Sequence, residues 1–224
     1  MNYDFMYTAF FGITFLLATV SQILITSTYN KNSKVSPRNG LTGEEAANKI
    51  IQGENFTVDV NVQGRSLSDH FDPRNDTVTL STSAKNSSVA DIAVTAHEFG
   101  HVSQKYSKSI LFNLRNGLVP IVNIGSNIGY ILIIVGLSAS ILNLAQLGLI
   151  LFSTTALFSL LTVPIELDAT KRGLSFIKKY NLLEDEYLPK AKSVLNAAAM
   201  TYVASLLTSL LNVLYFASRI RRKE

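Results

Sequence analysis

The stretch Ala96-His97-Glu98-Phe99-Gly100-His101 decides how the rest of this chain is arranged. His97 and His101 are four positions apart, so on a helix they lie one turn from each other on the same face. Two imidazoles on one helical face supply half of a tetrahedral zinc site, and a catalytic zinc site keeps one position open for water. Glu98 would project beside them, where its carboxylate can take a proton from that water. This HExxH pattern predicts one catalytic Zn²⁺ ion.

The flanking residues favour a helix around these histidines. Ser88, followed three positions later by Asp91, is typical of a capping box with Ser88 at the N-cap. Apolar residues between positions 89 and 102 give the helix a surface broad enough for burial. Gly100 would weaken a helix interior, so its position predicts close packing against another backbone. The alternative is an ordinary helix with two core histidines and a solvated glutamate.

Composition indicates a membrane protein with one modest polar domain. The chain has 224 residues, 47% of them hydrophobic, and its apolar residues are concentrated in blocks. It contains no cysteine, which excludes disulfides and thiolate metal ligands. The net charge is +4, and the basic residues flank apolar blocks without forming a stripe with interleaved aromatics. We therefore expect no nucleic-acid binding.

The apolar blocks predict membrane spans of helical length. Residues 5–27 are uncharged and lack both the basic region and the Ala-x-Ala site of a cleaved signal peptide, which indicates an anchor. Residues 118–163 carry no charged side chain and are too long for one span, so they predict a hairpin that turns near residues 143–146. Glycines and asparagines within it would allow close helix contacts and hydrogen bonds between helices. The last apolar span, residues 197–217, either crosses the membrane or packs without crossing.

These patterns predict an α-helical membrane protein with a small α+β catalytic domain. The predicted segments are an N-terminal transmembrane anchor (1–28), a catalytic domain with a small sheet and the HExxH helix (29–117), a transmembrane helical hairpin (118–163), a segment with the third zinc ligand and solvated helices (164–196), and a C-terminal transmembrane helix with a basic tail (197–224).

The sequence of the polar domain predicts a short helix followed by strands. Thr42 and Glu45 form a second capping box, which opens a helix that Gly53 would end. Alternating valines in residues 58–62 and the segment 77–81 are typical of strands, and we expect them to pair in an antiparallel sheet. An exposed edge strand of that sheet could bind an extended peptide beside the metal.

A site with two histidines needs a third protein ligand, and Glu166 is placed to provide it. It follows the hairpin closely, and a hairpin returns the chain to the side of the membrane that it left. Glu166 would complete a His₂Glu set. Asp168 could then accept a hydrogen bond from a histidine N–H. The alternative is a helix N-terminus at this point that the two acidic side chains stabilise.

Charge counting predicts the orientation of the catalytic domain. Asp4 is the only charged residue before the first span, whereas Lys31, Lys34 and Arg38 follow it. The positive-inside rule then places the catalytic domain in the cytoplasm. The basic residues after position 218 conflict with this orientation if the last span crosses fully.

Four motifs together resemble the YugP-like neutral zinc metallopeptidases of bacterial membranes. They are Asp69-His70-Phe71-Asp72-Pro73, the segment 96–101 above, Pro164-Ile165-Glu166-Leu167-Asp168-Ala169, and Ala197-Ala198-Ala199-Met200-Thr201-Tyr202-Val203-Ala204. The similarity covers nearly the whole chain, and a more distant one extends to the HtpX-type membrane proteases. The resemblance implies a zincin-like, more narrowly gluzincin-like, peptidase of the bacterial cell membrane. It further implies that His97, His101 and Glu166 bind zinc and that Glu98 is the general base.

The role of His70 stays open at this level. It could contact the metal, donate to the oxyanion of the reaction, or bind substrate. Alternatively, it is a turn histidine bonded to Asp69 or Asp72. Three tyrosines are further candidates for an oxyanion donor: Tyr106, Tyr180 and Tyr202.

The leading hypothesis is an integral membrane zinc endopeptidase, with peptides or membrane proteins as substrates and its catalytic domain at the cytoplasmic face. One alternative is a non-enzymatic membrane protein with structural zinc or a partner-binding role, although a structural site has no use for Glu98 as a base. Another is a zinc hydrolase of lipids or other amides. The sequence does not specify an oligomeric state.

Overall fold

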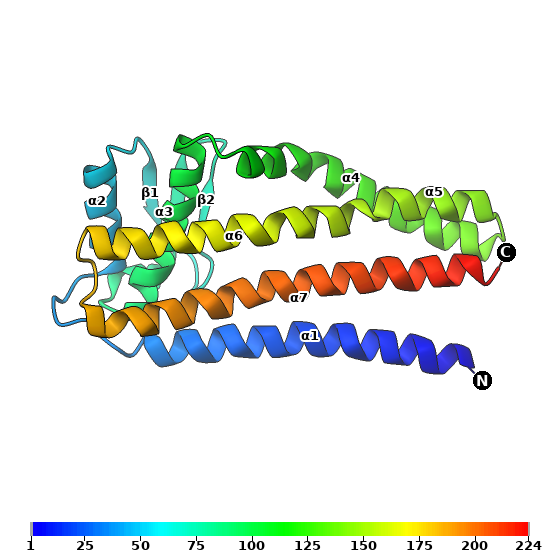
Figure 1. The fold of residues 1–224 in the computed structure, drawn as a ribbon, viewed down its shortest axis with the longest axis horizontal. Helices are drawn as coiled ribbons and strands as arrows, with labels where there is room; N and C mark the ends of the chain where they lie inside the picture. The colour runs from blue at the N-terminus through cyan, green and yellow to red at the C-terminus, as the bar shows by residue number, and fades with distance from the viewer. Residues whose placement is uncertain (1, 224) are drawn as a thin grey trace. The chain divides into compact units, whose positions relative to one another are not determined.

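The computed structural model describes residues 2–223, with side chains from Thr8 onward, and is mostly helical (Figure 1). The helices are α1 (Asn2–Asn32), α2 (Gly43–Glu54), α3 (Val89–Tyr106), α4 (Ile110–Ser138), α5 (Leu142–Phe152), α6 (Thr154–Lys179) and α7 (Leu188–Arg221), with short 3₁₀ helices η1 (Thr82–Lys85) and η2 (Asp185–Tyr187). The strands are β1 (Asp59–Val62), β2 (His70–Asp72) and β3 (Thr77–Leu80).

The chain divides into two compact units. The helical unit holds the residues up to Gln22, Asn113–Pro164, and the residues from Thr201 on. The mixed unit holds Ile23–Phe112 and Ile165–Met200, which include the sheet and the whole of α2 and α3.

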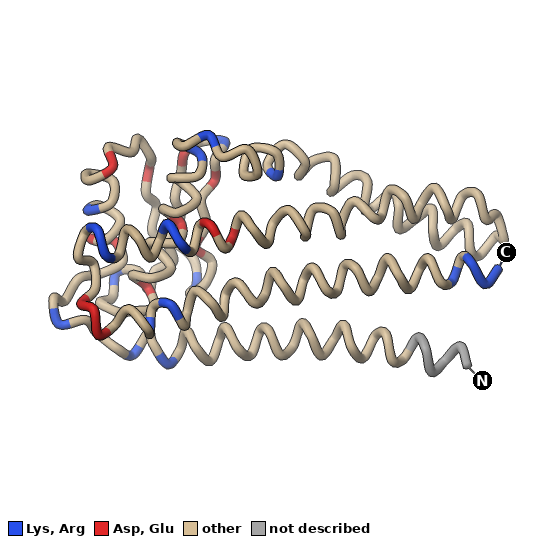
Figure 2. The backbone as a smooth tube through the Cα atoms, viewed as in Figure 1, with Lys and Arg blue, Asp and Glu red and all other residues tan. Residues whose placement is uncertain are grey.

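Among the described residues, four helical stretches are long and apolar enough to cross a membrane. They are Thr8–Asn32, Ile110–Ser138, Leu142–Lys179 and Asp185–Arg221. Residues 8–30, 116–165 and 193–218 contain no charged residue, and most positions coloured as charged in Figure 2 belong to the mixed unit. In the helical unit, large aliphatic and aromatic side chains such as Phe15 and Ile150 are about two-thirds exposed, which suits contact with lipid.

The apolar segment 118–163 folds back on itself as predicted, but the predicted position of the turn is wrong. The turn lies at residues 139–141, and residues 143–146 are inside α5. The turn occurs earlier because Ser140 takes a left-handed φ of 58° while Ile141 N–H donates to Gly136 O. A left-handed residue at the end of a helix is usually glycine, and because this position holds Ser140, the sequence did not indicate that the helix ends here.

The predicted close contact within this hairpin is confirmed, and one predicted hydrogen bond is not. A Cβ added at Gly129 would lie 2.8 Å from Gly148 O, and one added at Gly148 would lie 2.7 Å from Gly129 O. The absence of both side chains is what allows the two backbones to meet. Asn127, in contrast, donates to Asn123 O of its own helix at 2.8 Å.

The sheet of the mixed unit has the order β1-β3-β2 and is mixed, which corrects the antiparallel prediction. β1 pairs with β3 in parallel, with Val60 opposite Val78, and β2 pairs with β3 antiparallel, with Phe71 opposite Val78. Parallel neighbours need a long crossover. Here the crossover is the segment 63–76, and it contains β2, one of the two edge strands.

Both predicted N-caps are confirmed. Thr42 accepts from Glu45 N–H while the Glu45 carboxylate accepts from Thr42 N–H, and Ser88 accepts from Asp91 N–H. The helix after Thr42 does not end at Gly53: it continues to Glu54 and is capped by Asn55 in the left-handed region. Gly53 faces the Tyr180 ring, which lies 2.2 Å from the position that a Cβ would occupy.

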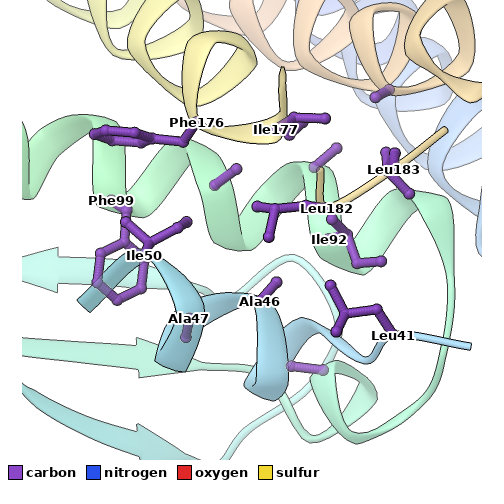
Figure 3. Close-up of a cluster of buried hydrophobic side chains, with 14 of the residues drawn as sticks. Leu41, Ala46, Ala47, Ile50, Ile92, Phe99, Phe176, Ile177, Leu182 and Leu183 are labelled. Atoms are coloured by element: carbon purple, nitrogen blue, oxygen red, sulfur yellow. The ribbon is translucent and has the colours of Figure 1, made fainter. Parts of the chain in front are cut away.

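A single apolar core joins α2 and the sheet to α3 and the end of α6 (Figure 3). Phe99 of α3, Ile50 of α2 and Ile177 of α6 are fully buried there. The chain after α6 also contributes, since Leu182 and Leu183 are buried in the same cluster. Residues 174–183 therefore pack one face against this core, while Lys178, Lys179 and Asn181 are exposed.

Helices α3 and α6 meet at two glycines. A Cβ at Gly100 would lie 2.3 Å from Ala169 O, and a Cβ at Gly173 would lie 2.8 Å from Ala96 O. Each glycine thus faces a backbone carbonyl of the other helix, which confirms the close packing predicted from Gly100. Pro164 lies inside α6, so the alternative of a helix N-terminus at that point is wrong.

We expect Gly100→Ala to lower stability by about 1–3 kcal/mol, because the added methyl overlaps the Ala169 carbonyl and forces α3 and α6 apart. Thermal unfolding of the metal-free protein in detergent measures this. Gly117→Ala in α4 is the matched control, since no heavy atom beyond its own turns of helix lies within 4 Å of its Cβ position. The control should be unchanged or more stable by up to about 1 kcal/mol. Equal melting temperatures for both variants would contradict the close approach.

Candidate metal centre

Helix α3 places the two histidines of the predicted site together. Its apolar face, with Ala96 and Phe99 fully buried, fixes the rotation of the helix on the core. His97 and His101 then follow one another by one turn, with ring centroids 4.9 Å apart and ring planes at 85°. Their side chains are 11% and 14% exposed, so the site is largely shielded from water while remaining accessible.

Helix α6 brings Glu166 to both rings. Its Oε2 lies 3.2 Å from His97 Nε2 and 3.4 Å from His101 Nε2, and the side chain is 6% exposed. This approach depends on the contact of the two helices at Gly100 and Gly173 described above. The two histidines of α3 and the distant Glu166 of α6 therefore offer ligand atoms that all lie within 4.8 Å of one another.

The spacing of these atoms fits a tetrahedral zinc ion. Zn–N and Zn–O bonds of about 2.0–2.1 Å at tetrahedral angles separate neighbouring ligand atoms by about 3.3 Å. The two carboxylate–imidazole separations agree with that value. The donor set also suits zinc, because two imidazoles and one carboxylate match the ligands of catalytic zinc sites and leave a position for water.

The other nitrogen of each ring has its own partner. His97 Nδ1 lies 3.3 Å from Thr170 Oγ1 of α6, and His101 Nδ1 lies 2.9 Å from Gln104 Oε1 of α3. Such contacts fix the orientation of a metal-binding imidazole and leave Nε2 toward the metal. Both Nε2 atoms here face Glu166.

Glu98 lies on α3 between the two histidines in sequence and is buried. Burial raises the pKa of Glu98, although the neighbouring His97 and His101 oppose this shift. Burial also disfavours the imidazolium form of His101, but the hydrogen bond and charge of Glu166 outweigh it and raise the pKa of His101. Glu98 is thus a carboxyl group able to exchange a proton close to the site.

Asp168 is near the site but does not contact a histidine. Its Oδ2 accepts from Gln104 Nε2 at 2.9 Å and from Arg172 Nε at 2.8 Å. Asp168 was the predicted acceptor for a histidine N–H, but Gln104 takes that place in the structure and Asp168 contacts Gln104.

His70 lies on the edge strand β2 and is exposed. Its Nδ1 lies 3.0 Å from Ser68 O. The two expected partners are engaged elsewhere: Asp69 accepts from Ser81, and Asp72 pairs with Arg74. The structure thus places His70 outside the group of three ligand residues, and its role in substrate binding stays a prediction.

Two of the three candidate tyrosines point to other partners. Tyr106 OH accepts from Thr57 N–H and donates to Thr57 O. Tyr180 OH donates to Glu54 at 2.7 Å. Neither contacts the histidines or Glu166.

The residues that the sequence did not reveal are Gln104, Thr170 and Arg172. Gln104 and Thr170 contact the ring nitrogens, while Arg172 donates to Asp168 and to Ser103 Oγ. A signal was present for Gln104, because a residue three positions after His101 lies on the same helical face. Thr170 could not be found without the packing of α3 on α6.

Comparison with known proteins shows the family of this chain. A family profile described as "putative neutral zinc metallopeptidase" matches residues 7–221. A protein of Bacillus subtilis (strain 168), named "Putative membrane protease YugP", is 34% identical over 218 residues, which cover 96% of this chain and 95% of the relative. No solved structure matches. A match over almost the whole length, together with the converging histidines and glutamate, establishes that the chain belongs to the neutral zinc metallopeptidase family of this profile and of YugP.

Proposed function

We propose that this protein is an integral membrane zinc metallopeptidase of the gluzincin type, in which a glutamate base activates water to hydrolyse peptide bonds. The observation that carries the proposal is the convergence of His97, His101 and Glu166 with Glu98 beside them. Family membership and the four apolar helical stretches support the metallopeptidase and membrane parts.

A zinc ion bound by these three residues would acidify water and polarise the peptide carbonyl. Glu98 takes the proton of the attacking water, whose oxygen forms the new bond to the carbonyl carbon. The C–N bond then breaks, and Glu98 delivers the proton to the leaving amine.

The edge of the sheet supports a peptide as the substrate class. β2 pairs with β3 on one side only, and no other described strand pairs with its outer edge. An extended peptide can add to such an edge by main-chain hydrogen bonds. His70 and Phe71 on this strand would then lie along the peptide.

Glu98→Gln should keep zinc and lose peptide cleavage by about 10²–10⁴-fold, because the amide cannot accept the proton. Zinc content and cleavage of casein or a quenched peptide in detergent measure both properties. Zinc without any cleavage by the wild type would favour the structural-zinc alternative. Equal cleavage by the two proteins would exclude Glu98 as the base.

Glu166→Ala should lose most of the zinc affinity while remaining folded, because it removes one of three ligands. Titration with zinc against a chromogenic chelator measures the change. Glu186→Ala, which removes an exposed carboxylate of η2, is the control and should bind zinc like the wild type. An unchanged affinity in Glu166→Ala would remove Glu166 from the ligand set.

We further propose that the mixed unit faces the cytoplasm, as the basic residues after the first span suggest. The absence of native cysteine makes this testable with single-cysteine variants and a membrane-impermeant maleimide in intact cells. Ala139→Cys, in the exposed hairpin turn, should be labelled, and Asn75→Cys should be labelled only after lysis. The opposite pattern would reverse the orientation. Labelling of Arg221→Cys in intact cells would indicate that the last helix crosses the membrane, and labelling only after lysis would indicate that it does not.

A further inference from the structure

Gln104 is a buried polar side chain that the hydrolytic mechanism does not use. It is 1% exposed and lies on α3 one turn after His101. Its Oε1 is 2.9 Å from His101 Nδ1, while its Nε2 donates to Ile165 O at 2.8 Å and to Asp168 Oδ2 at 2.9 Å. Burying an amide is costly unless its polar atoms have hydrogen-bond partners, and here each of them has one, so these partners fix the orientation of the amide.

The donors and acceptors around Gln104 permit only one arrangement. Ile165 O is a carbonyl and the Asp168 side chain is a carboxylate, so both need a donor. The amide NH₂ has two hydrogens, and both are used by these two acceptors. The amide oxygen is left to face His101, and it can only accept. His101 Nδ1 must therefore carry a hydrogen, and Nε2 is the ring nitrogen that faces Glu166 and the metal position.

The same amide also fixes the position of the third ligand. Ile165 directly precedes Glu166, so the bond to Ile165 O connects the α3 ligand pair to the backbone beside the α6 ligand. Asp168 is held in turn by Arg172, whose guanidinium also donates to Ser103 Oγ on α3. A continuous set of hydrogen bonds thus runs from the imidazole through Gln104 and Asp168 back to α3.

We propose that Gln104 is a positioning residue of the metal centre: it holds His101 in the Nδ1–H tautomer and fixes Glu166 at ligand distance through Ile165 O. This inference rests on the proposed metal site, but it makes a claim about the metal-free protein as well. The tautomer of His101 is set before any metal binds, which lowers the reorganisation that binding requires.

The first test reads the tautomer directly. The chain has three histidines, so long-range ¹H–¹⁵N spectra of ¹⁵N-histidine protein in mildly alkaline buffer are simple to assign with His70→Gln and His97→Gln. Metal-free wild type should show His101 protonated at Nδ1. Gln104→Met, which keeps the length of the side chain without polar atoms, should lose this preference.

The second test measures zinc affinity by competition with a chelator, together with the visible spectrum of the Co²⁺-substituted protein. Gln104→Met should weaken zinc binding by about 10- to 100-fold, as loss of other partners of metal-binding histidines does. Asp168→Ala serves if Gln104→Met fails to fold, since its side chain is 43% exposed, and it should weaken binding by about tenfold. Asp185→Ala, an exposed carboxylate away from α3, should leave affinity unchanged.

The outcomes separate this inference from the proposed function. A wild-type His101 protonated at Nε2, or zinc affinity within twofold of wild type in both Gln104→Met and Asp168→Ala, would overturn the positioning role and leave the peptidase proposal intact. A wild type that binds no zinc would overturn the proposed function, whereas the tautomer result would still decide the claim about Gln104. Loss of the Nδ1–H tautomer and of affinity in Gln104→Met, with both retained in Asp185→Ala, supports the inference.

Discussion

The contact of α3 with α6 at Gly100 and Gly173 is the constraint on which the site depends. Each glycine lets a carbonyl of the opposite helix approach to a distance that any side chain would forbid. Helices usually pack with their axes 8–10 Å apart, and small residues at the contact allow the near end of that range. A carboxylate on one helix can then reach two imidazoles on the other. With larger side chains at these two positions, Glu166 would be out of reach of the histidines.

The polar contacts around the site act at the same interface. Gln104 and Arg172 connect α3 to α6 on one side of the ligands, and Thr170 contacts His97 on the other. These groups orient the imidazoles and hold the helices in the one register that places Glu166 correctly. The three metal ligands lie on two helices, so a shift of one helix along the other would change the distances between the ligand atoms. The geometry of the metal site therefore depends on this register.

Local signals in the sequence accounted for much of the fold. The caps at Thr42 and Ser88 and the packing role of Gly100 could be predicted because each depends on a few neighbouring residues. The parallel pairing of β1 with β3 could not, since it is decided by the path of the intervening segment and by which edge β2 takes. The hairpin turn at Ser140 was not predicted because a serine does not indicate a left-handed backbone conformation in the way that a glycine does.

For the candidate site, the sequence indicated the ligands better than their supports. His97 and His101 follow from helical periodicity, and Glu166 from its position after the apolar hairpin. The partners Thr170 and Gln104 were not predicted because side-chain contacts across a helix pair depend on rotation and axial offset. Asp168 was assigned one contact too close to the metal, since sequence spacing does not show that an amide lies between it and His101.

The most direct test of the account is X-ray absorption at the zinc edge on the zinc-loaded wild-type protein. We predict a first shell of nitrogen and oxygen ligands at about 2.0–2.1 Å, with the multiple scattering of two imidazoles. A shell with three imidazoles would place His70 on the metal and contradict the role of Glu166 as third ligand. A shell with fewer than two imidazoles would contradict zinc binding by both His97 and His101, and therefore the proposed metal site at the contact of α3 with α6.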